Sequence, residues 1–141
     1  LNGVTKMKIN KDIKVFGDMG FRDKKCPTED AEQITFFNQL KKHYPEIAQL
    51  ATHIKNEGKK SHNQVSKDKV NGLNQGFADV VIIGNPMLYM EVKRQDHTAS
   101  KWQPNQEDKV LLAQKAGAFS CVALGYKGAW LALEAWINVQ R

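Results

Sequence analysis

The stretch that decides the fold runs from residue 76 to residue 93: Gly76-Phe77-Ala78-Asp79-Val80-Val81-Ile82-Ile83-Gly84-Asn85-Pro86-Met87-Leu88-Tyr89-Met90-Glu91-Val92-Lys93. Two runs rich in β-branched and aromatic residues, Phe77 to Ile83 and Met87 to Lys93, predict two strands. The Gly84-Asn85-Pro86 segment between them is typical of a turn. The stretch therefore predicts an antiparallel hairpin.

The sequence on either side of this hairpin predicts helices and further strands. Thr28 is a candidate N-cap, with acidic residues in the first turn after it and with Ala31, Ile34, Phe37 and Leu40 at helical spacing. The remaining predicted elements are a strand over 50–54, a helix over 106–116 capped by Asn105, a strand over 119–124 and a helix over 128–137. The predicted order is α-β-β-β-α-β-α, an α/β protein with a small mixed sheet flanked by helices.

The N-terminal region differs from the rest in charge. Residues 1–27 contain seven Lys or Arg and three Asp, and they include one candidate strand around Ile13–Phe16. We predict a basic N-terminal arm over 1–27 and a single domain over 28–141, a length that suffices for one hydrophobic core.

Composition narrows the class of protein. The 141 residues carry a formal charge of +6 and are 41% hydrophobic, and no apolar run approaches the roughly 20 residues of a membrane helix. There is no apolar leader, and the two cysteines, Cys26 and Cys121, are far apart, so we expect a protein of the reducing cytoplasm without a membrane partner. The sequence has no Gly-rich phosphate loop, which argues against a nucleotide cofactor. The positive charge favours an anionic partner such as nucleic acid.

The candidate chemistry lies in the hairpin. Alternation along the second strand places Glu91 and Lys93 on one face, and Asp79 opens the neighbouring strand. Two converging carboxylates suit Mg²⁺, with Mn²⁺ as a substitute, and a lysine beside them can stabilise charge that develops on a phosphate. The same pattern also fits a solvated ion pair on a strand surface, so the residues alone leave both interpretations open.

Six segments in order make the chain resemble the VRR-NUC family of PD-(D/E)XK nucleases, in particular its stand-alone phage and bacterial members. They are Glu32-Gln33, His53-Ile54-Lys55-Asn56-Glu57-Gly58, Gly76-Phe77-Ala78-Asp79, Met90-Glu91-Val92-Lys93-Arg94, Gln103-Pro104-Asn105-Gln106 and Gly117. Ala78 and Lys55 stand where the family usually has Pro, and Gln103 stands where it often has Ser, but none of these departures removes a charged group.

The resemblance implies a restriction-endonuclease-like core and assigns roles to individual residues. The implied ligands of the divalent metal are Asp79, Glu91, the backbone carbonyl of Val92, and Glu32 in the first helix, with Glu29 as the fallback. Lys93 is expected to orient or activate the attacking water, and Gln106 to hydrogen-bond near Lys93 or the scissile phosphate. The residues expected to contact DNA are Asn56, Lys59, Lys60, Lys67, Lys69, Arg94 and Trp102.

The implied activity is Mg²⁺-dependent hydrolysis of DNA phosphodiester bonds. Similarity to Holliday-junction resolvases suggests a structure-selective homodimer, with the helix that carries Trp130 and Trp136, or the basic arm, as the candidate dimer contact. The alternatives are a monomeric nickase of low sequence specificity, a non-catalytic DNA-binding module that retains the fold, and a housekeeping protein whose charge is incidental.

Overall fold

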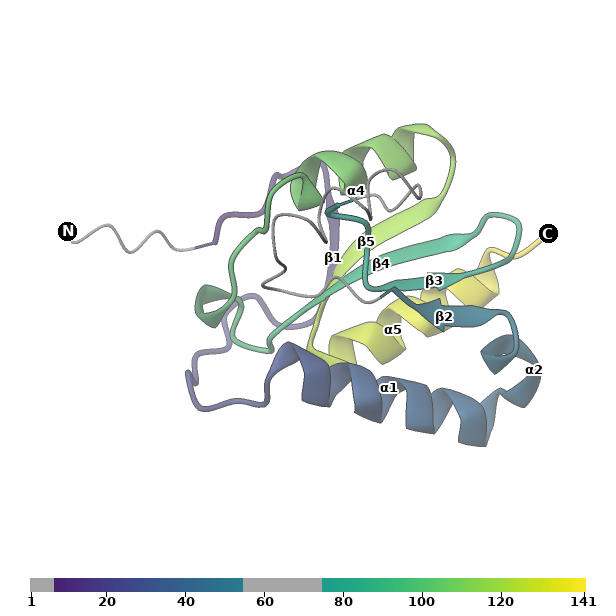
Figure 1. Ribbon diagram of the computed structural model, residues 1–141, viewed down its shortest axis with the longest axis horizontal. Helices are drawn as coiled ribbons and strands as arrows, with labels where there is room; N and C mark the ends of the chain where they lie inside the picture. Colours follow the sequence, from purple (N-terminus) through teal and green to yellow (C-terminus); the bar gives the residue numbers. More distant parts are fainter. Residues whose placement is uncertain (1–6, 55–74) are drawn as a thin grey trace, which may run out of the picture.

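A mixed β-sheet forms the centre of the molecule (Figure 1). The computed structural model describes residues 7–54 and 75–141. Within these residues the sheet has five strands in the order β1-β5-β4-β3-β2. The strands are β1 (Lys14–Phe16), β2 (Ala51–His53), β3 (Val80–Ile82), β4 (Leu88–Lys93) and β5 (Phe119–Leu124). The predicted hairpin is confirmed, since β3 and β4 pair antiparallel, with Val80 opposite Met90.

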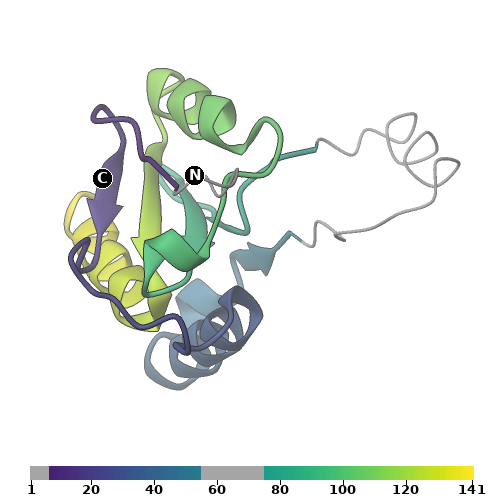
Figure 2. The ribbon, with the colours of Figure 1, turned by 90° about the vertical axis from the view of Figure 1, so that its left-hand side faces the viewer.

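Helices cover both faces of the sheet. They are α1 (Glu29–His43), α2 (Pro45–Ala48), the 3₁₀ helix η1 (His97–Ala99), α4 (Gln106–Lys115) and α5 (Gly125–Asn138). The two ribbon views place α1 and α5 on one side of the sheet and α4 on the other (Figures 1 and 2). The predicted order of elements is confirmed from residue 29 onward, with α2 and η1 as short additions.

The central strand β4 separates two hydrophobic cores, and all six of its residues are buried. Met90 and Val92 belong to the core beneath α1 and α5, whereas Tyr89 belongs to the core beneath α4. Because side chains alternate along a strand, Glu91 and Lys93 face the α4 side together, as the sequence predicts. A charged pair on a buried central strand is unusual, because Glu and Lys are seldom fully buried unless they are paired.

The N-terminal segment is packed onto the domain from residue 7. Met7, Ile13 and Cys26 are buried, and β1 pairs parallel with β5, so the strand predicted around Ile13–Phe16 is confirmed as a sheet edge. Gly128 allows this arrangement, since a Cβ there would collide with the carbonyl of Phe16. The segment that the sequence suggests as an arm thus supplies part of the core, because its apolar side chains are buried.

No helix within residues 7–54 and 75–141 combines the length and the apolar character that a bilayer span requires.

Candidate active site

The hairpin places Asp79, just before β3, next to the part of β4 that carries Glu91 and Lys93. Asp79 lies directly before β3, and its Oδ2 accepts a hydrogen bond from the backbone N–H of Val92 at 3.1 Å. This bond holds the carboxylate across β4, between the two polar residues on its α4 face. The residues that the sequence predicts as the centre of the site therefore lie together.

Glu91 is a buried carboxylate with an unused acceptor. Its side chain is 1% exposed, and its Oε2 accepts a hydrogen bond from Gln106 Nε2 at 3.0 Å and lies 3.6 Å from Lys93 Nζ. Its Oε1 has no hydrogen-bond partner among the described residues. Burial, and then the negative charge of Asp79, raise the pKa of Glu91 well above its ordinary value. A buried carboxylate oxygen without a partner is costly, and a bound cation would satisfy it.

Lys93 is held in one orientation by three neighbours. Its Nζ donates to Gln106 Oε1 and to the backbone carbonyl of Lys101, both at 2.8 Å, and it lies 5.4 Å from the ring centroid of Trp102. The chain after β4 turns through η1 and returns over the site, which brings Lys101 and Trp102 there. The ammonium is 1% exposed and is therefore fixed rather than free to reorient in solvent.

Gln106, the first residue of α4, connects Glu91 with Lys93. Its Nε2 donates to Glu91, while its Oε1 accepts from Lys93 and from the backbone N–H of Gln103 at 2.8 Å. The Gln106 side chain is 5% exposed. Its oxygen and nitrogen can be told apart, because one end faces two donors and the other faces a carboxylate. Gln106, which the sequence places near Lys93, therefore lies between the Glu91 carboxylate and the Lys93 ammonium.

The first helix directs Glu29 toward the site. Burial raises the pKa of Glu29, the charge of Lys93 opposes that rise, and the charge of Asp79 adds to it, so Glu29 is within electrostatic range of both groups. Ser100 Oγ donates to Glu29 Oε2 at 2.7 Å and accepts from the backbone N–H of Arg94. The Glu32 carboxylate lies against Gly125 and Gln95, and Gly125 directly follows Leu124, the β5 partner of Lys93.

The phase of α1 explains the position of Glu29. The sequence predicts that Ile34 shares the buried face with Leu40, but Ile34 is 63% exposed, and Gln33, Phe36 and Leu40 are the buried residues. Positions 29, 33, 36 and 40 follow the 4-3-4 spacing of one helix face, so Glu29 lies on the face that meets the sheet. The predicted apolar face was therefore wrong by a rotation of the helix about its axis.

Two of the residues predicted to contact DNA have structural partners. Arg94 donates from Nη2 to the carbonyls of Lys24 (3.0 Å) and Cys26, and from Nε to that of Pro27, which fastens the N-terminal segment. Trp102 Nε1 donates to the carbonyl of Lys8 at 2.9 Å. The other residues predicted for this role, Asn56, Lys59, Lys60, Lys67 and Lys69, lie outside the described residues.

Sequence reasoning missed Ser100 and the Lys101 carbonyl, because no residue pattern marks either group. Ser100 is an isolated serine in a polar segment, and a backbone carbonyl has no identity that a sequence motif can record. Only the return of the chain over β4 brings the two groups to Glu29 and Lys93.

The donor set fits a hard divalent cation in part. Within 7–54 and 75–141, no group of three or more His, Cys, Asp and Glu side chains is arranged to hold a metal ion. Asp79 and the unpartnered Oε1 of Glu91 supply hard oxygen donors, and Mg²⁺ is commonly bound by one or two carboxylates together with water and substrate phosphate. The residues present are compatible with such binding.

The raised pKa of Glu91 predicts a pH signature in metal-free protein. Because the folded state binds this proton more tightly than the unfolded state, the charged form destabilises the fold at neutral pH, and the penalty disappears as pH falls through the folded pKa. We expect wild type to gain stability relative to Glu91→Gln as the pH is lowered from 8 to 5. The difference in unfolding temperature, wild type minus Glu91→Gln, should therefore be larger at pH 5 than at pH 8. Parallel pH profiles of the two proteins, measured by calorimetry in EDTA, would contradict this expectation.

Comparison with known proteins agrees with this geometry at the level of the fold. No family model matches the sequence, and no curated protein matches it significantly. The structure is similar to a solved structure described as a VRR_NUC domain protein, with a TM-score of 0.68 and 21% sequence identity. The alignment covers 81% of this chain and 91% of that one. The chain therefore has the restriction-endonuclease-like α/β fold of the VRR-NUC domain.

Proposed function

We propose that this chain is a metal-dependent DNA endonuclease that hydrolyses phosphodiester bonds. The observation that carries the proposal is the convergence of Asp79, Glu91 and Lys93 at one end of the sheet, where Glu91 keeps a buried oxygen without a partner. Two carboxylates that converge beside a lysine suit the binding of a metal ion and a phosphate, a use that neither a binding module nor a housekeeping fold has.

The acidic residues would bind the metal ion, and Lys93 acts on the attacking water and the phosphate. Asp79 and Glu91 would hold Mg²⁺ or Mn²⁺, with the Val92 carbonyl as the further predicted ligand. The bound ion would supply Lewis-acid polarisation of the phosphate and a lowered pKa for water. Lys93 orients the attacking water and stabilises negative charge on the phosphate, while Gln106 and the Lys101 carbonyl keep its ammonium in place.

Glu29 is proposed as the carboxylate that α1 contributes, in place of Glu32. We expect Glu29→Gln to reduce cleavage about 10- to 100-fold, because Gln keeps an acceptor for Ser100 Oγ but loses the charge. Glu32→Gln, the matched control on the same helix turn, should leave cleavage close to wild type. Initial rates on one DNA substrate measure both variants, and a larger loss for Glu32→Gln would reverse the assignment.

The proposed substrate is branched DNA, which a homodimer would cut symmetrically. The helix α5 offers little tryptophan surface for that dimer, since Trp136 is 3% exposed and donates to the carbonyl of Pro86. Trp130 lies in an aromatic cluster with Phe36, His43, Tyr44 and Tyr126. Leu131, 52% exposed on α5, and Ile34 on α1 are better candidates for a contact between copies.

A cleavage assay on a panel of DNA structures tests the proposal. Wild-type protein is incubated with four-way junctions, duplex and single-stranded DNA in Mg²⁺, Mn²⁺ or EDTA. We expect cleavage with either metal and none in EDTA, whereas no cleavage of any substrate with either metal would refute the proposal. Paired symmetric nicks in the junction support the dimeric resolvase, and single nicks by a protein of monomeric mass support the nickase.

A further inference from the structure

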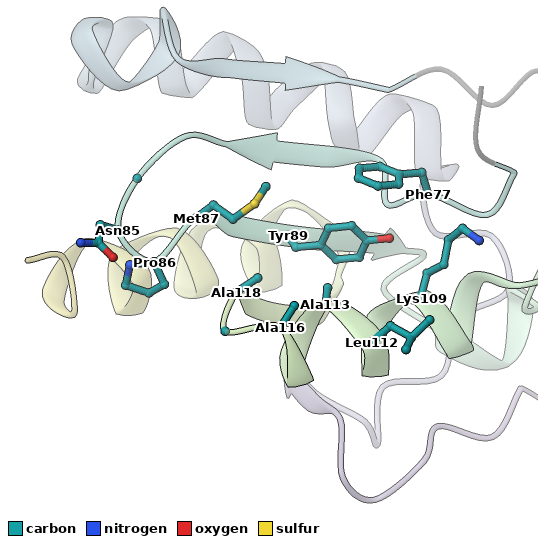
Figure 3. A pocket seen from close by; sticks show the side chains of 12 residues that line it. Phe77, Asn85, Pro86, Met87, Tyr89, Lys109, Leu112, Ala113, Ala116 and Ala118 are labelled. Atoms are coloured by element: carbon teal, nitrogen blue, oxygen red, sulfur yellow. The ribbon is translucent and has the colours of Figure 1, made fainter. Parts of the chain in front are cut away.

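An apolar pocket of about 610 Å³ lies next to the candidate active site, between β4 and α4 (Figure 3). We call it the Phe77–Tyr89 pocket, after the two aromatic residues at the end nearest the site. Phe77 is two residues before Asp79, Tyr89 is two residues before Glu91, and Lys109 is three residues after Gln106. Tyr89 and Glu91 are two residues apart on β4, which corresponds to roughly 7 Å, so the pocket begins within one nucleotide's length of Glu91.

The walls of the pocket suit a flat, apolar group. The rings of Phe77 and Tyr89 meet edge to face with centroids 5.0 Å apart, and Met87, Leu112 and Ala113 continue the apolar wall. Met87 is 37% exposed and Leu112 63% exposed, so this part of the wall faces solvent, whereas Tyr89, at 3%, forms the buried floor. Burial raises the pKa of Tyr89 to about 12, and its hydroxyl accepts from the backbone N–H of Ala78, so the ring is neutral and fixed.

The charge at the rim suits an anion attached to that flat group. Lys109 extends from α4 toward the Phe77 end of the pocket (Figure 3), and none of the residues that line the pocket is acidic. A nucleotide has this combination, because its base has two apolar faces and its phosphate is negative. Aromatic side chains and cations are the groups that bind single-stranded nucleic acid.

We propose that the Phe77–Tyr89 pocket receives an unpaired nucleobase of the strand that enters the active site. This inference rests on the proposed function and deepens it, since the substrate then is DNA with an unpaired nucleotide next to the bond that is cut. A base inside a duplex is stacked on both faces and must leave the helix to reach a pocket. The free-energy cost of unstacking and unpairing a base is smallest in mismatched, branched or single-stranded DNA and largest in fully paired DNA.

Binding in EDTA tests the proposal without depending on cleavage. The probes are two hairpin oligonucleotides that contain 2-aminopurine, one with the analogue unpaired in the stem and one with it paired. We expect wild type to bind the unpaired probe more tightly and to quench its fluorescence as the base stacks. Phe77→Ala should weaken binding of the unpaired probe roughly 5- to 150-fold and leave binding of the paired probe unchanged.

Filling the pocket provides a second variant that keeps the fold. Ala113→Leu adds bulk to the pocket on a residue type that favours helix, and Gln114→Leu makes a similar change on an exposed position of the same helix. We expect Ala113→Leu to reduce affinity for the unpaired probe to the level of the paired probe, and Gln114→Leu to bind as wild type does. Equal affinity of wild type and Ala113→Leu for the unpaired probe overturns the proposal, as does equal loss on both probes.

The outcomes separate this proposal from the proposed function. If the affinities shift as expected but wild type cleaves no DNA, the pocket assignment stands and the nuclease assignment fails. If wild type cleaves DNA but the pocket variants bind as wild type does, the pocket assignment fails alone. A change of mass in light scattering for Ala113→Leu would show that the pocket contacts a second copy of the chain, which also overturns the proposal.

Discussion

Lys93→Met is expected to lower the rate of DNA cleavage by about 10²- to 10³-fold, the range for removing one donor that stabilises charge in the transition state. Met has nearly the length of the lysine side chain but neither charge nor N–H donors. The variant therefore loses the group that donates to Gln106 and the Lys101 carbonyl and to which we assign the orientation of the attacking water. Single-turnover cleavage of a labelled substrate at saturating enzyme measures the loss without a contribution from weaker binding.

We expect Lys93→Met to remain folded. The charge of Lys93 lowers the pKa of Glu91, so its removal raises that pKa further, and Glu91 takes up a proton rather than remaining as an unpaired buried charge. Lys101→Met is the matched control, because Lys101 is exposed and contributes only its backbone carbonyl to the site. Cleavage by Lys93→Met at the rate of Lys101→Met would remove Lys93 from the mechanism.

Asp79→Asn is expected to reduce cleavage by more than about 100-fold, since loss of a direct ligand should exceed the effect of losing an outer hydrogen bond. Asn retains an oxygen that can accept from the backbone N–H of Val92, so the hairpin keeps its contact. The variant therefore changes the charge of the site with little change in its shape. Cleavage rates in Mg²⁺ and in Mn²⁺ measure the effect.

Metal binding provides a second measurement for Asp79. An ion that binds only the folded state raises the unfolding temperature, so Mn²⁺ should stabilise wild type and should stabilise Asp79→Asn much less. Asp12→Asn, at an exposed position near the N-terminus, makes the same chemical change away from the site and should respond as wild type does. An equal Mn²⁺ response in all three proteins would show that Asp79 does not bind the ion.

Elements whose stability depends on local sequence were predicted well. The strand predicted over 119–124 is confirmed at both ends, and α1 begins after Thr28, whose side chain accepts from the backbone N–H of Ala31. The hairpin is confirmed because alternation, β-branched residues and a turn all point to it. Asn105 occupies the N-cap position of α4, but its side chain makes no capping hydrogen bond, since its backbone is left-handed there (φ 71°).

Features that depend on packing between elements were predicted less well. The side of α1 that meets the sheet is fixed by Phe36 and Leu40 in the core beneath α5, and both an Ile34 face and a Phe36 face satisfy helical periodicity. That rotation places Glu29 on the face of α1 that meets the sheet. Likewise, the parallel pairing of β1 with β5 depends on contacts between residues about 100 positions apart, which local patterns do not record.

The sequence by itself determined the hairpin and therefore the meeting of Asp79, Glu91 and Lys93, because period-two alternation and a short turn place them by local geometry. Only the tertiary structure decided that Glu29 accompanies them, that Gln106 and the Lys101 carbonyl hold the lysine, and that an apolar pocket opens beside them. Those contacts join α1, the segment after β4, and α4 to one end of the sheet. Their geometry follows from how whole elements pack and from which side-chain atoms lose water, neither of which a local pattern specifies.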